Sequence, residues 1–327
     1  MSNRINQFIN KKFLIYAFGI FFCYSYYGIL QEKITRAKYG IKREVFTYSM
    51  SLVFVQCIIN TLFALVQIFV VNRKSEGQVH DTTTHFFYGF SALSYLTAMV
   101  SSNRALQHVS YPTQVIAKSC KPIPVMIIGV FYARKRYSIL KYFFVFMIVL
   151  GVGIFMYNPN KTSGAPIQQS RTFIGELLLL LSLTCDGFTG AFQDRMKSEH
   201  GTKPGHMMLW MNAWSSLILF VALTITGELW QFIDFVNRFP FVISFILQFS
   251  AMSAIGQLFI FLTITSFGPL ACSLITTTRK FFTVLFSVIL FGNSLSNQQW
   301  LGSGLVFLGL SLDMFYGKQP PIKKPLL

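Results

Sequence analysis

The chain has 327 residues, of which 53% are hydrophobic and only 12% are charged. Because soluble domains carry about 25% charged residues, this composition excludes an ordinary soluble enzyme. The net charge of +17 is compatible with nucleic-acid binding, but the basic residues stand in short clusters between long apolar runs, as at Arg134, Lys135 and Arg136. That arrangement is typical of the cytosolic loops of a membrane protein, so we expect no nucleic-acid partner.

The cysteines and histidines give no sign of a metal site. All five cysteines fall inside apolar runs without the spacing of metal ligands: Cys23, Cys57, Cys120, Cys185 and Cys272. Neither a disulfide framework nor a zinc site is indicated. The sequence also lacks a P-loop, a His-Glu-x-x-His run and an Asp-x-Asp pair. We therefore expect no cofactor, no metal ion and no catalysis of a soluble type.

Ten apolar segments follow one another along the chain, each near the length of about 20 residues that the hydrocarbon core requires. Lys11 and Lys12 precede the first segment, which lacks a small-residue cleavage site. We interpret it as a retained helix rather than a signal peptide. The predicted spans are residues 13–31, 45–71, 84–107, 109–131, 138–157, 171–193, 206–226, 240–264, 268–292 and 297–316.

Charge in the loops predicts the orientation of these spans. With ten spans, both termini lie on one side of the membrane, and that side carries most of the basic loop residues. The positive-inside rule places it in the cytosol. The first loop is an exception that nothing in the sequence explains, because it carries five cations on the opposite side: Lys33, Arg36, Lys38, Lys42 and Arg43.

The two halves of the chain resemble each other. The segment Gly28–Ile34 (GILQEKI) is echoed by Gly190–Met196 (GAFQDRM), and Pro112 and Pro269 each open a span with basic residues at its centre. Since five spans per half is an odd number, the second half must enter the membrane inverted. We predict an all-α membrane protein of ten helices in two inverted five-helix repeats, with a substrate site near the midplane between them. The predicted repeats are residues 1–160 and 161–327.

Two of the spans carry cations near their centres. Lys118 and Lys121 lie roughly 14 to 18 Å into a hydrocarbon core about 30 Å thick. Arg279 and Lys280 reach a similar depth from the opposite direction. Burying four such cations costs about 10 to 14 kcal/mol on insertion scales, so an anion must compensate them. A phosphate fits, because Arg279 offers bidentate hydrogen bonds and lysines offer mobile charges.

Other polar residues accompany these cations. Helical spacing places Tyr111 and Gln114 on the face of Lys118 and Lys121, and Thr276 beneath Arg279. All three are weaker candidates for substrate binding.

Acidic residues in or beside the spans offer an alternative to a phosphate, because they could neutralise the cations themselves. The candidates are Glu32, Asp186 and Glu176. Glu32 could balance the cluster, accept a hydrogen bond from a base or sugar, or simply be a surface acid. Gln257 is a weaker candidate for base recognition, with helix packing as its alternative.

Proline and glycine mark two further places. Pro122 and Pro124 should interrupt their helix beside Lys121 and free backbone groups to face a cavity, unless they form a simple packing kink. Three glycines of the last span are typical of a close-packing face rather than of a nucleotide loop: Gly302, Gly304 and Gly309.

Four runs of residues closely resemble the nucleotide-sugar transporter family of the drug/metabolite transporter superfamily. Within it they resemble the endoplasmic-reticulum B-type branch, the UDP-galactose-transporter-related proteins, also described as ATP/ADP exchangers. The runs are Tyr27–Arg36 (YGILQEKITR), Met99–Val125 (MVSSNRALQHVSYPTQVIAKSCKPIPV), Gly175–Leu183 (GELLLLLSL) and Ile275–Thr283 (ITTTRKFFT).

The resemblance implies a ten-helix antiporter that works by alternating access, with both termini in the cytosol. It also implies that phosphates bind at the matching residues Lys118, Lys121, Arg279 and Lys280, and that Glu32 matches the family's glutamate after the first helix. We expect exchange of cytosolic ATP for lumenal ADP, because four cations suit a triphosphate. The alternative is import of UDP-galactose or UDP-glucose in exchange for UMP. Remote alternatives are an intramembrane transferase and a non-transporting scaffold.

The resemblance places the protein in the membrane of the endoplasmic reticulum. Lys323 and Lys324 are similar to a cytosolic dilysine retrieval signal, but they stand one residue further from the C-terminus than the usual pattern. The alternative is a solvated basic tail.

Overall fold

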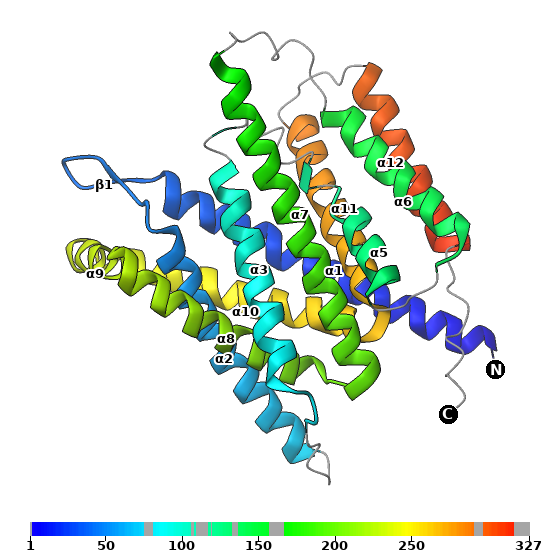
Figure 1. Ribbon diagram of the computed structural model, residues 1–327, viewed down its shortest axis with the longest axis horizontal. Helices are drawn as coiled ribbons and strands as arrows, with labels where there is room; N and C mark the ends of the chain where they lie inside the picture. Colours follow the sequence, from blue (N-terminus) through cyan, green and yellow to red (C-terminus); the bar gives the residue numbers. More distant parts are fainter. Residues whose placement is uncertain are drawn as a thin grey trace. The chain divides into compact units, whose positions relative to one another are not determined.

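The computed structural model is almost entirely helical (Figure 1). Among the residues that it describes, five helices are long and apolar enough to cross a membrane, and three shorter apolar helices accompany them. The chain is therefore a multi-pass helical membrane protein, while ten spans in inverted repeats stay a prediction. The described residues are 2–74, 81–105, 108, 117–118, 120–132, 137–156, 167–290 and 297–316.

Most helices correspond to predicted spans, and several extend beyond them. The helices are α1 (Ser2–Arg36), α2 (Ser49–Lys74), α3 (His85–Ala105), α5 (Pro122–Phe131), α6 (Ile139–Met156), α7 (Ile167–His200), α8 (Pro204–Thr226), α9 (Glu228–Arg238), α10 (Val242–Phe267), α11 (Pro269–Leu290) and α12 (Asn297–Tyr316). The strands are β1 (Lys38–Tyr39) and β2 (Glu44–Val45).

The end of α7 shows why a helix can outrun its apolar segment. Beyond the predicted limit at residue 193, Arg195 Nε donates to Glu199 Oε1 at 2.7 Å, an i,i+4 ion pair that supports polar helical turns. The helix stops at Gly201, whose φ of 63° lies in the left-handed region that favours glycine. Its N–H binds the carbonyl of Lys197 at 3.1 Å, which satisfies one of the last carbonyls of the helix.

The chain packs as two compact units. The first comprises Met1–Leu96 and Phe192–Thr276, and the second comprises Thr97–Ala191 and Thr277–Leu327. Each unit combines segments from both halves of the sequence, so the packing units and the predicted repeats, residues 1–160 and 161–327, are different divisions of the chain. The repeats stay a prediction.

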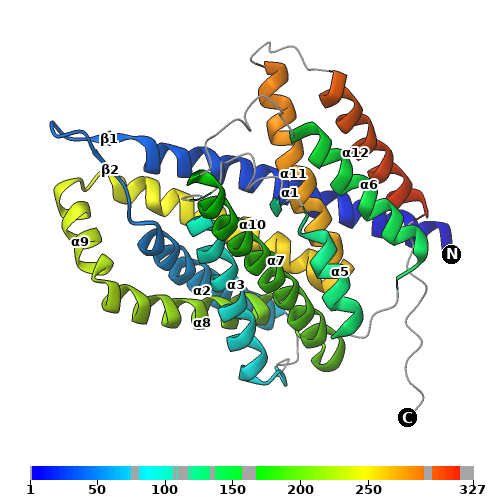
Figure 2. The ribbon, with the colours of Figure 1, turned by 45° about the horizontal axis from the view of Figure 1, so that its top comes forward.

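In the first unit, α1 packs along α10 and α2 packs along α8 (Figure 2). A small residue allows the first of these contacts, since a Cβ atom at Gly256 of α10 would lie 2.9 Å from the ring of Tyr24 in α1. The buried core of this unit is rich in methionine and includes Met196, Met207 and Met208.

Two elements of the first unit lie almost wholly in segments predicted as loops, since only Val45 of β2 falls in the predicted span 45–71. The strands β1 and β2 form an antiparallel hairpin in which Lys38 faces Val45. The helix α9 is amphipathic, and at 11 residues it is too short to cross a membrane. Its Phe235 is 1% exposed and lies against Tyr39 of β1, with ring centroids 5.2 Å apart. The first loop and the α8–α10 connection therefore form one folded body.

In the second unit, α6 and α12 lie side by side (Figures 1 and 2). A Cβ atom at Gly302 would come within 2.7 Å of the carbonyl oxygen of Gly151, and one at Gly309 within 2.9 Å of Ile148. The close-packing prediction is confirmed for these two glycines. It is wrong for Gly304, since a Cβ atom there would meet no described atom within 4 Å.

Candidate phosphate-binding site

The backbone changes its hydrogen-bonding pattern at Lys118. Pro122 has no N–H with which to bind the Lys118 carbonyl, four residues earlier. The N–H of Lys121 donates to that carbonyl instead, at 3.4 Å, and so replaces the usual α-helical bond by a tighter i→i−3 bond. The helix α5 then begins at Pro122.

The same replacement recurs two residues later. Pro124 cannot reach the carbonyl of Cys120, and the N–H of Ile123 binds it at 3.0 Å. The two prolines thus interrupt the α-helical pattern beside Lys121, as predicted. Lys118 and Lys121 are the two ends of this tighter turn.

Asp186 of α7 binds both lysines. Its Oδ2 accepts a hydrogen bond from Lys118 Nζ at 2.7 Å, and its Oδ1 accepts one from Lys121 Nζ at 3.0 Å. The neighbouring residue makes this approach possible, because a Cβ atom at Gly187 would lie 2.6 Å from Ile128 and 3.0 Å from the Pro124 carbonyl oxygen. The two ammonium groups therefore share one carboxylate.

The cluster is buried and carries more positive than negative charge. The side chains of Lys118, Lys121 and Asp186 are 14%, 33% and 8% exposed. One carboxylate against two ammonium groups leaves an excess of one positive charge. An acid within the membrane helices therefore pairs with both lysines, and Lys121 is the more accessible of the two cations.

The two predicted cations of α11 are Arg279 and Lys280. Arg279 is half-buried, and the side chain of Lys280 lies outside the described residues. One turn earlier, Thr276 donates its hydroxyl to the Ser273 carbonyl at 3.0 Å. The convergence of Arg279 and Lys280 with the two lysines of the other helix stays a prediction.

Four further candidates are placed as follows. Tyr111 and Gln114 lie outside the described residues, and Glu32 belongs to α1 but its side chain lies outside them too. Glu176 is exposed on α7. None of the four therefore adds a described contact to the cluster.

Gln257 belongs to a buried amide cluster of the first unit that the sequence reasoning missed. Its Oε1 accepts hydrogen bonds from Asn60 Nδ2 at 2.7 Å and from Asn212 Nδ2 at 2.9 Å. Asn60 and Asn212 are 0% and 3% exposed. These bonds favour the packing interpretation of Gln257. The available signal was the position of two asparagines inside apolar spans, where polar side chains are rare and usually paired.

The described residues contain no group of three His, Cys, Asp or Glu side chains that could hold a metal ion. All five cysteines are free thiols. The Lys118–Asp186–Lys121 cluster offers two ammonium groups, which can donate hydrogen bonds to anionic oxygens.

Comparison with known proteins decides the class of the molecule. Residues 12–316 match the UAA transporter family. The chain belongs to the UAA transporter family.

Relatives cover nearly the whole of this UAA transporter. Solute carrier family 35 member B1 of Danio rerio is 55% identical over 313 residues, which are 94% of this chain and 93% of the relative. The protein of that name from Xenopus tropicalis is 54% identical over 318 residues, 96% of each chain. The Drosophila melanogaster homolog is 49% identical over 325 residues, 96% of this chain and 94% of its own.

A solved crystal structure shares the fold of this UAA transporter. It has a TM-score of 0.64, covers 93% of this chain and 96% of its own, and is 9% identical in sequence. Family and fold together make the protein a multi-pass membrane transporter, of the nucleotide or nucleotide-sugar class that the sequence resemblance indicates.

Proposed function

We propose that the protein exchanges cytosolic ATP for lumenal ADP across the membrane of the endoplasmic reticulum by alternating access. The observation that supports this best is the buried cluster in which Lys118 and Lys121 share the carboxylate of Asp186. A transporter that keeps an excess of positive charge within its membrane helices needs an anionic substrate to compensate it. Phosphate oxygens can take the place of the carboxylate oxygens at both ammonium groups.

The charge of the full site favours a long phosphate chain. If Arg279 and Lys280 join the two lysines, the four cations and Asp186 leave an excess of three positive charges. ATP and ADP carry roughly four and three negative charges, and UDP-galactose or UMP roughly two. Import of UDP-galactose or UDP-glucose in exchange for UMP is the alternative substrate pair at the same site.

The architecture that we propose for this exchange is a ten-helix carrier. Two inverted five-helix repeats, residues 1–160 and 161–327, would bring the cations of two helices together near the midplane. Both termini would face the cytosol, since the basic loop residues are more numerous on that side. Glu32, Tyr111, Gln114 and Thr276 are proposed as weaker contributors to substrate binding, whereas the hydrogen bonds of Gln257 favour a packing role.

The charge balance around Asp186 favours obligatory exchange of substrates over net transport of one substrate. The carboxylate pairs with both lysines, and these three buried side chains together carry one excess positive charge. Closing the carrier around that charge is unfavourable, whereas closing it around a bound nucleotide is not. Substantial efflux of nucleotide without a counter-substrate would contradict this mechanism.

The phosphate site can be tested through nucleotide-dependent stability. We expect ATP and ADP to raise the unfolding temperature of the purified protein more than AMP, UMP or UDP-galactose, because a ligand stabilises the state to which it binds. Lys118→Ala should weaken apparent ATP affinity at least tenfold. Lys203→Ala, which removes an exposed lysine before α8, is the matched control and should bind ATP normally. Equal ATP binding by both variants would remove Lys118 from the site.

A further inference from the structure

The tip of the β1–β2 hairpin has an unusual backbone. Its four connecting residues run from Gly40 to Arg43, and the Arg43 N–H binds the Gly40 carbonyl at 3.2 Å. Arg43 has a φ of 53°, in the left-handed region that side chains other than glycine rarely adopt. Such strain persists where surrounding structure enforces it and is found most often at functional sites.

The tip exposes an apolar residue between cations. Ile41 is fully exposed, with a fractional exposure of 102%. Lys38, Lys42 and Arg43 around it are exposed as well, and none of them has an ion-pair partner among the described residues. Exposing the isoleucine side chain to water is unfavourable, because apolar surface is stabilised when it is removed from water.

The hairpin is held firmly against α9. Arg238 Nη1 donates to both carboxylate oxygens of Glu44, each at 2.7 Å. Phe46, next to β2, packs edge-to-face on Phe235 with ring centroids 5.6 Å apart. At the other end of α9, Glu228 Oε1 accepts hydrogen bonds from the N–H and hydroxyl of Ser51 in α2. We call residues 38–45 together with α9 the hairpin platform.

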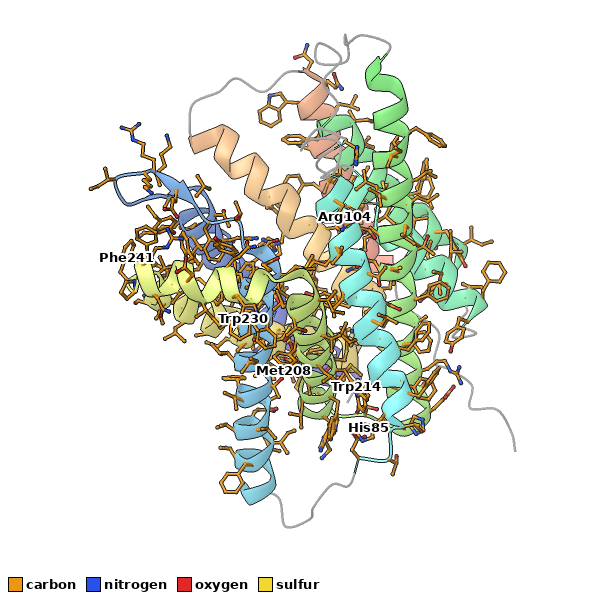
Figure 3. All side chains as sticks on the ribbon, turned by 60° about the vertical axis from the view of Figure 1, so that its left-hand side comes forward. His85, Arg104, Met208, Trp214, Trp230 and Phe241 are labelled. Atoms are coloured by element: carbon orange, nitrogen blue, oxygen red, sulfur yellow. The ribbon has the colours of Figure 1, made fainter. Side chains whose placement is uncertain are left out.

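The outward side of α9 is also apolar. Trp230 and Ile233, one helical turn apart, are 68% and 41% exposed, and Phe241 just beyond the helix is 57% exposed. Figure 3 labels Trp230 and Phe241. The buried residue of the same helix is Phe235, so α9 presents aromatic side chains both inward and outward. Trp side chains with this exposure favour the membrane–water interface.

The platform lies where membrane helices end. The hairpin begins two residues after α1, and α9 begins two residues after α8. The next helices, α2 and α10, begin four residues after β2 and α9 end. We propose that the hairpin platform lies in the headgroup layer and binds anionic phospholipids. Ile41, Trp230 and Ile233 enter the acyl boundary, and Lys38, Lys42 and Arg43 bind the lipid phosphates. This occupant accounts for three of the five cations of the first loop, which the positive-inside rule leaves unexplained.

Lipid titration of the full-length protein tests the proposal. In detergent, phosphatidylserine should raise the unfolding temperature at lower concentration than phosphatidylcholine. Arg43→Gly and Lys42→Gln should each weaken this effect roughly fivefold, since a cation near an anionic surface contributes about that factor. Arg43→Gly also relieves the strained φ, so a loss of lipid response cannot be attributed to misfolding. Lys203→Gln, at the opposite end of α8, is the control and should respond like wild type.

A second measurement separates the bilayer from other partners. In vesicles that contain lipids brominated near the headgroup, Ile41→Ser should reduce the quenching of Trp230 fluorescence, measured as the difference between the parent and its Trp230→Phe variant. Equal responses to phosphatidylserine and phosphatidylcholine would overturn the proposal. Equal stabilisation by soluble inorganic phosphate would also overturn it, because it would indicate a site for free anions. So would quenching of Trp230 that appears only after a soluble protein has been removed from the hairpin platform.

Discussion

Asp186 holds the cluster together, because its two oxygens bind two different lysines. Asp186→Asn removes the negative charge that pairs with both ammonium groups. Breaking a buried ion pair on one side costs about 3 to 5 kcal/mol, so we expect a marked fall in the free energy of unfolding. Thermal unfolding of the purified variant measures this.

Nucleotide should reverse part of that loss. An added phosphate chain replaces the missing carboxylate, so ATP should stabilise Asp186→Asn more than it stabilises wild type, and its apparent affinity should rise. If the variant is as stable as wild type and binds ATP more weakly, Asp186 contributes to the substrate contact rather than competing with it.

The sequence predicted the residue types of this cluster but not their pairing. Lys118 and Lys121 stand out because cations are rare in apolar spans. That Asp186 binds both lysines depends on how α7 approaches α5, and that approach depends on Gly187. The amide cluster of Asn60, Asn212 and Gln257 joins three helices. These residues are far apart in the sequence, so the sequence alone does not show that they meet.

Among the elements, α12 offers a matched pair of glycines. A Cβ atom at Gly302 would collide with the backbone of Gly151 and Phe155 at 2.7 Å, whereas one at Gly304 has open space. Gly302→Ala should therefore destabilise the protein by about 1 to 3 kcal/mol, as overpacking does. Gly304→Ala should be neutral or slightly stabilising, since alanine favours a helix.

Unfolding curves of the two variants in one detergent make the comparison direct. A destabilisation of the same size in both would show that helix packing does not distinguish the two positions.

The loop before α3 contains a carboxylate whose effect depends on pH. Burial alone would raise the pKa of Asp81, but hydrogen bonds from Thr83 and Tyr88 together hold that pKa below its usual value. Since the folded protein binds this proton less tightly than the unfolded chain, Asp81 stabilises the fold above about pH 4. That contribution is lost as the pH falls through the lowered pKa.

Asp81→Asn should consequently be less stable than wild type at pH 7, and the difference should shrink as the pH is lowered below about 4. Chemical denaturation at several pH values measures the difference. A gap between the two proteins that stays constant down to pH 3 would show that the ionised carboxylate is not what stabilises the loop.

Hydropathy predicted the long helices well and the short elements poorly. A window of about 20 residues detects α2, α8 and α10, but it averages out an amphipathic helix of 11 residues such as α9. The hairpin has strands of only two residues, which leave no alternating pattern to detect. Both elements owe their stability to mutual packing around Phe235 rather than to local sequence preference.

For the whole molecule, composition alone predicted a membrane protein, and the family confirms a transporter. Its packing units could not be predicted, because each one combines segments from both halves of the chain. Direction and substrate are properties of the complete carrier in a membrane. They have to be measured on the reconstituted protein.

The most direct test is uptake of labelled ATP and, separately, of labelled UDP-galactose into proteoliposomes that are empty or preloaded with ADP or UMP. We expect wild type to take up ATP only against ADP, and Lys280→Ala to take up none. The control variant Lys203→Ala should behave as wild type. Preferred uptake of UDP-galactose against UMP, or equal ATP uptake into empty vesicles, would contradict ATP/ADP exchange.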